Sequence, residues 1–186
     1  MKLSILSLTL FSSCSLFGTK YSNQKKSFPK DKALLTIYRP WRFAGSVIDP
    51  YTCLNNKVVG EFYNGKYYHL ILKPGKYHVD HAALFDGPSE NGVHFEAKPG
   101  EQYFLRFEAS QIVGVDPAAS VRPPIVSLLN PMRDLKELEK ISDQRVQKKI
   151  NNPGLMFVKE SYALSELKDI ERYEKKKFNS TACNAN

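Results

Sequence analysis

Residues 60–79 read Gly-Glu-Phe-Tyr-Asn-Gly-Lys-Tyr-Tyr-His-Leu-Ile-Leu-Lys-Pro-Gly-Lys-Tyr-His-Val, and this stretch decides the expected fold. Asn64-Gly65 is a favoured two-residue hairpin signal, because both residues tolerate the positive φ that a type I′ turn requires. Pro74-Gly75 supplies the fixed φ and the positive φ of a type II turn, after which the chain folds back. The stretch therefore predicts an antiparallel meander of consecutive strands.

The rest of the central region continues this pattern of short strands and turns. Lys98-Pro99-Gly100 repeats the chemistry of the Lys73-Pro74-Gly75 turn. Further strands are predicted at 33–39, 46–54, 58–62, 77–84, 93–97, 103–108 and 121–129. Short strands with turn signals about every ten residues are typical of a sandwich. We therefore expect a mainly β protein, an antiparallel β-sandwich of seven or eight strands over residues 33–130.

Amphipathic helices are predicted after the sandwich. Asn130-Pro131 is a helix start, with an N-cap side chain followed by proline in the first turn. Apolar residues then recur at helical spacing, which predicts helices that pack on the sandwich. One of these helices is expected to run from Ser161 to Phe178, and Leu155–Val158 is a candidate for a short added strand. We expect a helical extension over 131–178 and a disordered tail over 179–186.

The amino terminus predicts export and a lipid anchor. Leu3–Phe11 is an apolar run of about ten residues, too short to span a bilayer but typical of a secretory signal. Phe11-Ser12-Ser13-Cys14 resembles a bacterial lipobox, although leucine is more usual at the first position. We expect a signal peptide at 1–13, lipidation of Cys14 with palmitate or a similar chain, and a flexible basic tether over 14–32. The alternative is an ordinary signal peptide in which Cys14 is incidental.

The location of the anchored protein is predicted from the residue after the lipid. Ser15 stands where an aspartate would resemble an inner-membrane retention signal. We therefore expect a lipid-anchored protein of the bacterial cell envelope, at the outer membrane and facing the periplasm.

The net charge of +8 does not indicate nucleic-acid binding. Residues 33–130 hold nine Lys and Arg against nine Asp and Glu, so the excess lies in the flanking segments. Nucleic-acid-binding proteins usually place a basic face on the folded element that docks. We expect the membrane, reached through the lipid, and an envelope protein as partners, and no nucleic acid.

The central region also carries motifs of a known family. They include Ile37-Tyr38-Arg39-Pro40, Asn56-Lys57-Val58-Val59-Gly60, Pro74-Gly75-Lys76-Tyr77-His78-Val79 and Gly100-Glu101-Gln102-Tyr103-Phe104. These motifs resemble the bacterial envelope family called domain of unknown function 2846, over about residues 33–130. The resemblance implies a small β-sandwich on secreted or lipid-anchored proteins. It implies no catalytic residues.

No reactive group of residues is predicted. His78-Val79-Asp80-His81 is the one cluster that invites a metal or acid–base role, but strand alternation places His78 and Asp80 on one face and His81 on the other. His69 and His94 are too isolated in the sequence to be placed. The chain also lacks a Gly-x-Ser-x-Gly elbow, a phosphate-binding glycine loop and a His-Glu-x-x-His helix. We expect no enzyme, cofactor or metal.

A contact for a ligand or partner is predicted at Arg39, Trp41 and Arg42. Tryptophan and arginine are favoured interface anchors, and an aromatic ring can stack on a sugar. The alternative is that Trp41 covers an open end of the sandwich. A lipid anchor and the absence of a reactive cluster in the sequence favour a structural or protein-interaction module. The alternative function is a module that binds glycan, peptidoglycan or lipid.

The pairing of the remaining cysteines stays open. An oxidising compartment would permit a disulfide between Cys53 and Cys183. However, Cys53 lies in a predicted strand, where it suits a small buried residue, and Cys183 lies in the predicted tail. These positions favour two unpaired cysteines.

Overall fold

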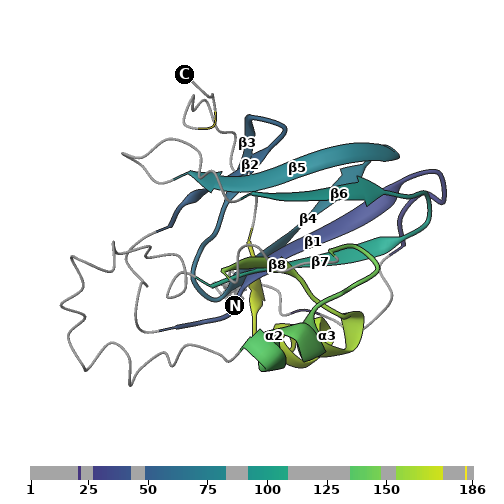
Figure 1. The fold of residues 1–186 in the computed structure, drawn as a ribbon. Coiled ribbons are helices and arrows are strands. Elements are labelled where there is room, and N and C mark those ends of the chain that lie inside the picture. The colour runs from purple at the N-terminus through teal and green to yellow at the C-terminus, as the bar shows by residue number, and fades with distance from the viewer. Residues whose placement is uncertain are drawn as a thin grey trace, which may run out of the picture.

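The structure is a computed structural model that describes residues 21, 27–42, 49–82, 92–108, 135–147, 154–173 and 183. Two β-sheets stack on each other, and two short helices lie on the outer side of one of them (Figure 1). This arrangement confirms the mainly β prediction with helices near the carboxyl terminus.

The first sheet has the order β8-β7-β1-β4-β9. Its strands are β1 (Ala33–Arg39), β4 (Lys66–Leu72), β7 (Gln102–Phe107), β8 (Leu155–Phe157) and β9 (Glu171–Arg172). Every residue of the central strand β1 is buried, because the sheet is covered on both faces. The β1–β7 and β4–β9 pairs are parallel, whereas the other pairs are antiparallel as predicted.

The second sheet is antiparallel throughout and has the order β3-β2-β5-β6. Its strands are β2 (Tyr51–Leu54), β3 (Lys57–Glu61), β5 (Gly75–Ala82) and β6 (Val93–Ala97). Asn55 and Asn56 join β2 to β3 with φ of 48° and 62°. Two successive positive φ values match the right-handed twist of a hairpin. The tight hairpin therefore lies at Asn55-Asn56.

The predicted meander over residues 60–79 is wrong. Strands β3 and β5 belong to the second sheet and β4 to the first, so both turns in this stretch carry the chain between sheets. At Asn64-Gly65 only Gly65 has a positive φ, of 67°, so the type I′ hairpin does not form. The Pro99-Gly100 turn likewise leads from β6 to β7 in the other sheet. Turn chemistry reverses the chain but does not decide which sheet the next strand joins. Strand β4 pairs with β1 of the first sheet, and Tyr68, Leu70 and Leu72 fill the core between the sheets.

The helices form a third layer on the first sheet (Figure 1). They are α2 (Leu135–Ile141) and α3 (Glu160–Leu167). They share an apolar cluster with the sheet that contains Tyr38, Tyr67, Phe104, Leu138, Met156, Val158, Ala163, Leu167 and Ile170. A separate core fills the space between the two sheets and includes Leu35, Ile37, Leu70, Val79, Phe95, Leu105, Phe107 and Phe157.

The predicted helix from Ser161 to Phe178 is too long. Helix α3 ends at Leu167, and the next residues add strand β9 to the edge of β4. Ile170 packs in the helix-side cluster and Tyr173 against the core between the sheets. A spacing of three places two residues on opposite faces of a strand, so the same apolar spacing suits both a helix and this edge. The added strand at Leu155–Val158 is confirmed, since Leu155–Phe157 forms β8 and Val158 forms a bridge with Ser142.

The described part of the predicted tether contacts the folded body at Tyr21 and at Lys32, whose carbonyl accepts a hydrogen bond from the backbone N–H of Gly100 at 2.7 Å. The backbone N–H of Tyr21 donates to the carbonyl of Ile170 at 3.3 Å, and its ring meets the ring of Tyr67 edge-on at 5.1 Å. Cys14, the signal peptide at 1–13, the predicted strand at 121–129 and the helix start at Asn130 lie outside the described residues. Within the described part, no helix is both long and apolar enough to cross a membrane.

Candidate functional site

Arg39 is a structural residue, which corrects its prediction as a contact for a partner. Its side chain is 1% exposed, and Nη1 donates to the carbonyl of Phe62 at 2.8 Å and to Asp49 at 3.2 Å. The guanidinium also lies 5.7 Å from the ring centre of Phe107. Burial lowers the pKa of Arg39, and Asp49 opposes this effect. Arg39 therefore stabilises the end of the sandwich from inside.

Trp41 is exposed, in contrast, at 64%. Its ring and Cβ lie close to Gly65, where an added Cβ would come within 3.3 Å of both Cβ and Cδ1 of Trp41. The backbone of Arg42 exchanges two hydrogen bonds with the side chain of Asn64, at 2.8 and 2.7 Å. Trp41 and Arg42 are therefore held against the Asn64-Gly65 turn by these contacts. We call Trp41 and Arg42 on this turn the Trp41 corner.

A buried ionic network lies behind this corner and was not predicted. Arg106 on β7 is fully buried and binds Glu166 of α3 with two nitrogens, Nε at 2.8 Å and Nη2 at 3.2 Å. The hydroxyl groups of Tyr38 and Tyr162 also donate to Glu166, at 2.8 and 3.1 Å. Burial raises the pKa of Tyr38, and the charge of Glu166 adds to this effect. Glu166 thus joins α3 to β1 and β7.

Glu108 extends the network to the Trp41 corner. It accepts a hydrogen bond from Nη1 of Arg106 and another from Nε of Arg42, the latter at 2.9 Å. Burial alone would raise the pKa of Glu108, but Arg106 and then Arg42 outweigh it, so the pKa is lowered. Burial alone would likewise lower the pKa of Arg106, but Glu166 and Glu108 raise it. Two arginines and two glutamates therefore neutralise one another.

The sequence contains a partial signal for this network. Arg106 lies within the apolar stretch Tyr103–Phe107, and Glu108 follows this stretch directly. The two residues are two positions apart, so they share one face of a strand. Burying a charge is costly unless it is paired and hydrogen-bonded. An Arg-x-Glu pattern inside an apolar strand therefore indicates a buried ion pair, but nothing local identifies Glu166 as its third member.

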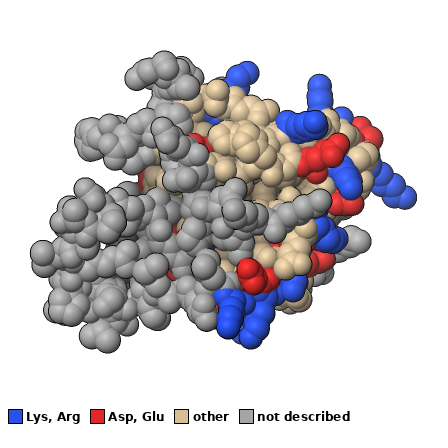
Figure 2. Space-filling model, viewed as in Figure 1, with Lys and Arg blue, Asp and Glu red and all other residues tan. Residues whose placement is uncertain are grey.

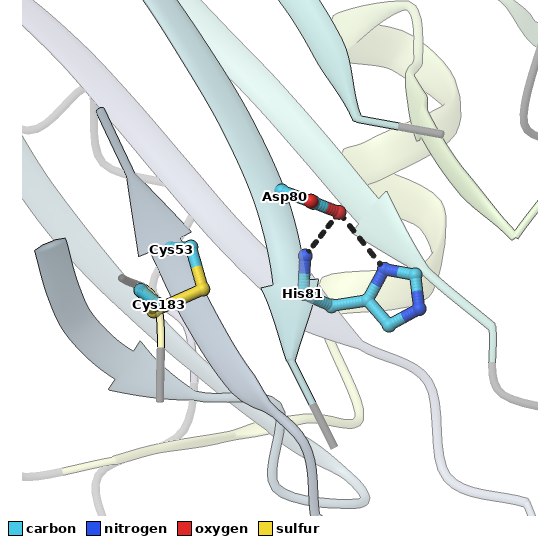
Figure 3. The surroundings of a disulfide bond; sticks show 4 residues. All are labelled: Cys53, Asp80, His81 and Cys183. Carbon is cyan, nitrogen blue, oxygen red and sulfur yellow. Dashed lines mark hydrogen bonds and ion pairs between the residues drawn. A yellow bond between two sulfur atoms is a disulfide. The ribbon is translucent and has the colours of Figure 1, made fainter. Parts of the chain in front are cut away.

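The second sheet carries a disulfide between Cys53 and Cys183 (Figure 3). Their Cα atoms lie 5.5 Å apart although 130 positions separate them, and both residues are buried. This finding overturns the preference for two unpaired cysteines. Cys183 therefore lies next to β2 in space. This proximity depends on the tertiary structure, and no local sequence pattern predicts it.

Strand alternation separates His78 from His81 as predicted, although Nδ1 of His81 lies 3.5 Å from Oδ1 of Asp80 (Figure 3). The ring of His81 lies edge-on to Phe107 in the core at 5.6 Å, whereas His78 stacks on His94 at 4.3 Å on the opposite face. Asp80 is the register partner of Cys53, and it accepts a hydrogen bond from the backbone N–H of His81 at 2.7 Å (Figure 3). Partial burial, followed by the nearby His94, lowers the pKa of His78. The three side chains of the 78–81 cluster do not converge on one point.

Charges on the surface are mixed. On the face in Figure 2, Lys and Arg side chains stand beside Asp and Glu side chains, and large areas between them are uncharged. In the described part of the chain, no group of three or more His, Cys, Asp or Glu side chains is placed to hold a metal ion. The Trp41 corner offers an exposed aromatic ring next to Arg42, whose charge is neutralised by Glu108.

A comparison with family models identifies the central region. Residues 29–120 match the model of a family described as protein of unknown function (DUF2846). This segment belongs to the DUF2846 family. The DUF2846 segment holds β1 to β7, the Trp41 corner, Arg106 and Glu108, whereas Glu166 and Cys183 follow it. No curated protein and no solved structure matches the chain.

The two connections described above therefore cross the boundary of the DUF2846 segment. The disulfide ties Cys183 to β2, and the ionic network ties α3 to β7. Strands β8 and β9 also complete the first sheet from outside the segment. The carboxy-terminal residues are thus part of the same folded body.

Proposed function

We propose that this protein is a lipid-anchored component of the bacterial cell envelope, at the outer membrane and facing the periplasm, and that it serves as a structural or protein-interaction module. The disulfide between Cys53 and Cys183 carries this proposal. Disulfides persist in oxidising compartments such as the periplasm and are rare in the cytosol. The chain has three cysteines, and with two of them paired, the third is Cys14 in the lipobox-like segment. The envelope family that the central motifs resemble supports the same location.

Lipidation is tested at Cys14. In a bacterial host fed a labelled palmitate analogue, the wild-type chain is expected to carry the label and to sediment with membranes. The Cys14→Ser variant is expected to lose the label and to leave the membrane fraction, because no thiol remains at position 14 to accept the lipid. Cys183→Ser is the matched control, since it removes a different cysteine and should keep both label and membrane association. A Cys14→Ser chain that stays labelled and membrane-bound would contradict the anchor.

The interaction role is assigned to the Trp41 corner. An exposed tryptophan next to an arginine is a typical interface anchor. Here the ring is held on Gly65, and Arg42 is fixed by Asn64 and Glu108, so little conformational freedom is lost when a partner binds. Arg39 is buried and takes no part in this surface.

The role of Trp41 is tested by cross-linking in cells. A photoreactive phenylalanine analogue at position 41 is expected to form a discrete cross-link to an envelope protein, and the same analogue at position 71 is not. Ile71 is the matched control because it is the other large exposed apolar side chain in the described part, at 58%. Trp41→Ala should change the free energy of unfolding by less than about 0.5 kcal/mol, as for most exposed positions. Equal cross-linking from both positions would contradict the assignment.

Exposure of the same ring also favours a glycan-binding module as the second candidate function. Trp41 is the chain's one tryptophan, so its intrinsic fluorescence reports directly on this corner. Saturable quenching by peptidoglycan fragments, with no protein cross-link, would favour this second function over the first.

A further inference from the structure

Two histidines that are far apart in the sequence meet on the second sheet. His78 on β5 and His94 on β6 are direct register partners, and their rings stack at 4.3 Å with 24° between the planes. Val79, Val93 and Phe95 alternate with them and fill the core between the sheets. The two imidazoles therefore lie on the outer face, where His94 is exposed and His78 is half-buried.

The surroundings leave space at this pair. An open pocket of about 370 Å³ is lined by Asn55, Lys76, Tyr77, His78, His94, Phe95 and Glu96. The side chain of Asn55 accepts a hydrogen bond from the backbone N–H of His78 at 2.8 Å, which fixes the β2–β3 hairpin beside the pair. Gly92 makes room for the ring, since an added Cβ there would lie 2.1 Å from Nε2 of His78. The pair is thus accommodated by the local backbone and remains open to solvent.

We propose that His78 and His94 together bind one divalent transition-metal ion of the Zn²⁺, Ni²⁺ and Cu²⁺ class. Side chains directly opposite each other on antiparallel strands have Cβ atoms about 4.5–5.5 Å apart. Two imidazoles at that separation reach a shared ion at the usual Zn–N distance of about 2.0–2.1 Å once the rings turn out of their stack about the Cβ–Cγ bonds. Water fills the remaining coordination positions.

The donor chemistry sets the metal class. Imidazole suits zinc, copper and nickel, whereas Ca²⁺ and Mg²⁺ take oxygen ligands. Glu96 follows His94 by two positions and so shares its face, and it also lines the pocket. Lys76, the register partner of Glu96, is the opposing positive charge at this site. This inference extends beyond the sequence analysis, in which His94 could not be placed.

The site is tested by isothermal titration calorimetry on the full, tag-free, disulfide-oxidised chain in detergent, with ZnCl₂ and, separately, MgCl₂. One Zn²⁺ per chain and no Mg²⁺ are expected. His94→Ala should weaken Zn²⁺ binding at least about tenfold, because loss of even an outer-shell partner costs about 10–100-fold. His69→Ala is the matched control, since His69 lies on β4 in the other sheet.

A second measurement separates metal binding from a folding defect. Imidazole NMR signals of His78 and His94 should shift with Zn²⁺ in the wild-type chain, while those of His69 and His81 stay in place. Because His94 is exposed, His94→Ala should keep the wild-type melting temperature. Absence of Zn²⁺ binding, or unchanged binding in His94→Ala, would overturn the proposal.

Discussion

Replacing Cys53 and Cys183 together by alanine is expected to lower the free energy of unfolding by about 3–5 kcal/mol. The bond joins residues 130 positions apart, and in the chain-entropy model a cross-link over so long a loop restricts the unfolded chain by about 5 kcal/mol. Both sulfurs are buried, so the substitution also removes packed atoms from the outer side of the second sheet. The disulfide is thus expected to be one of the largest single contributions to stability.

The measurement is urea-induced unfolding of the oxidised wild type, the double variant, and the wild type with reductant. The double variant and the reduced wild type should unfold at similar, lower urea concentrations. Cys14→Ser is the matched control, because it removes a cysteine outside the bond and should leave the midpoint unchanged. A double variant within about 0.5 kcal/mol of the oxidised wild type would show that the bond does not stabilise the fold.

Arg106→Met is expected to lower the free energy of unfolding by about 3–5 kcal/mol, the usual effect of breaking a buried ion pair. The substitution removes the fully buried guanidinium that binds both Glu108 and Glu166, and Glu108, which is 5% exposed, keeps only the second arginine, Arg42. The hydroxyl groups of Tyr38 and Tyr162 still donate to Glu166, but two neutral donors do not replace a bidentate cation.

Lys66→Met is the matched control for Arg106→Met. Lys66 pairs with Glu171, and both side chains are more than one-third exposed, so water screens the pair. Exposed pairs contribute about 0–1 kcal/mol, and the loss should stay in that range. Adding Glu166→Gln to Arg106→Met should recover part of the lost stability, because it removes one of the two negative charges that Arg106 neutralises. Equal losses from Arg106→Met and Lys66→Met in chemical denaturation would contradict the role of the network.

The network also bears on the proposed interaction surface. Arg42 is part of the Trp41 corner, and its side chain binds Glu108, which in turn binds Arg106. The exposed ring is therefore connected to α3 through a chain of ion pairs that ends at Glu166. Residues after the DUF2846 segment thus help to hold a surface within it.

Local features of the sequence were sufficient for most strands. Ala33–Arg39 and Val93–Ala97 were predicted with the bounds they have, since both are rich in β-forming residues and end at proline turns or loops. The separation of His78 from His81 was also correct, because strand alternation depends on the backbone alone. For the same reason, the added strand at Leu155–Phe157 was recognisable from its apolar run.

Tertiary structure alone decided the partners of these elements. Asn64-Gly65 and Pro74-Gly75 reverse the chain in either a meander or a crossing between sheets, and only the pairing of β4 with β1 in the first sheet selects the crossing. Likewise, the apolar spacing of Ile170 and Tyr173 fits a helix, and only the pairing of Glu171 and Arg172 with the edge of β4 shows that this segment is a strand.

The same limit applies to the sites. Arginine is a residue type common at interfaces, and only the tertiary structure shows that Arg39 is buried and donates to the carbonyl of Phe62. Cys183 meets Cys53, Glu166 meets Arg106, and His94 meets His78 across 130, 60 and 16 positions. The sequence by itself determined most strands and turns, because these depend on neighbouring residues, and it predicts the anchor at Cys14. Contacts between distant residues depend on how the sheets and helices stack, and therefore only the tertiary structure decided them.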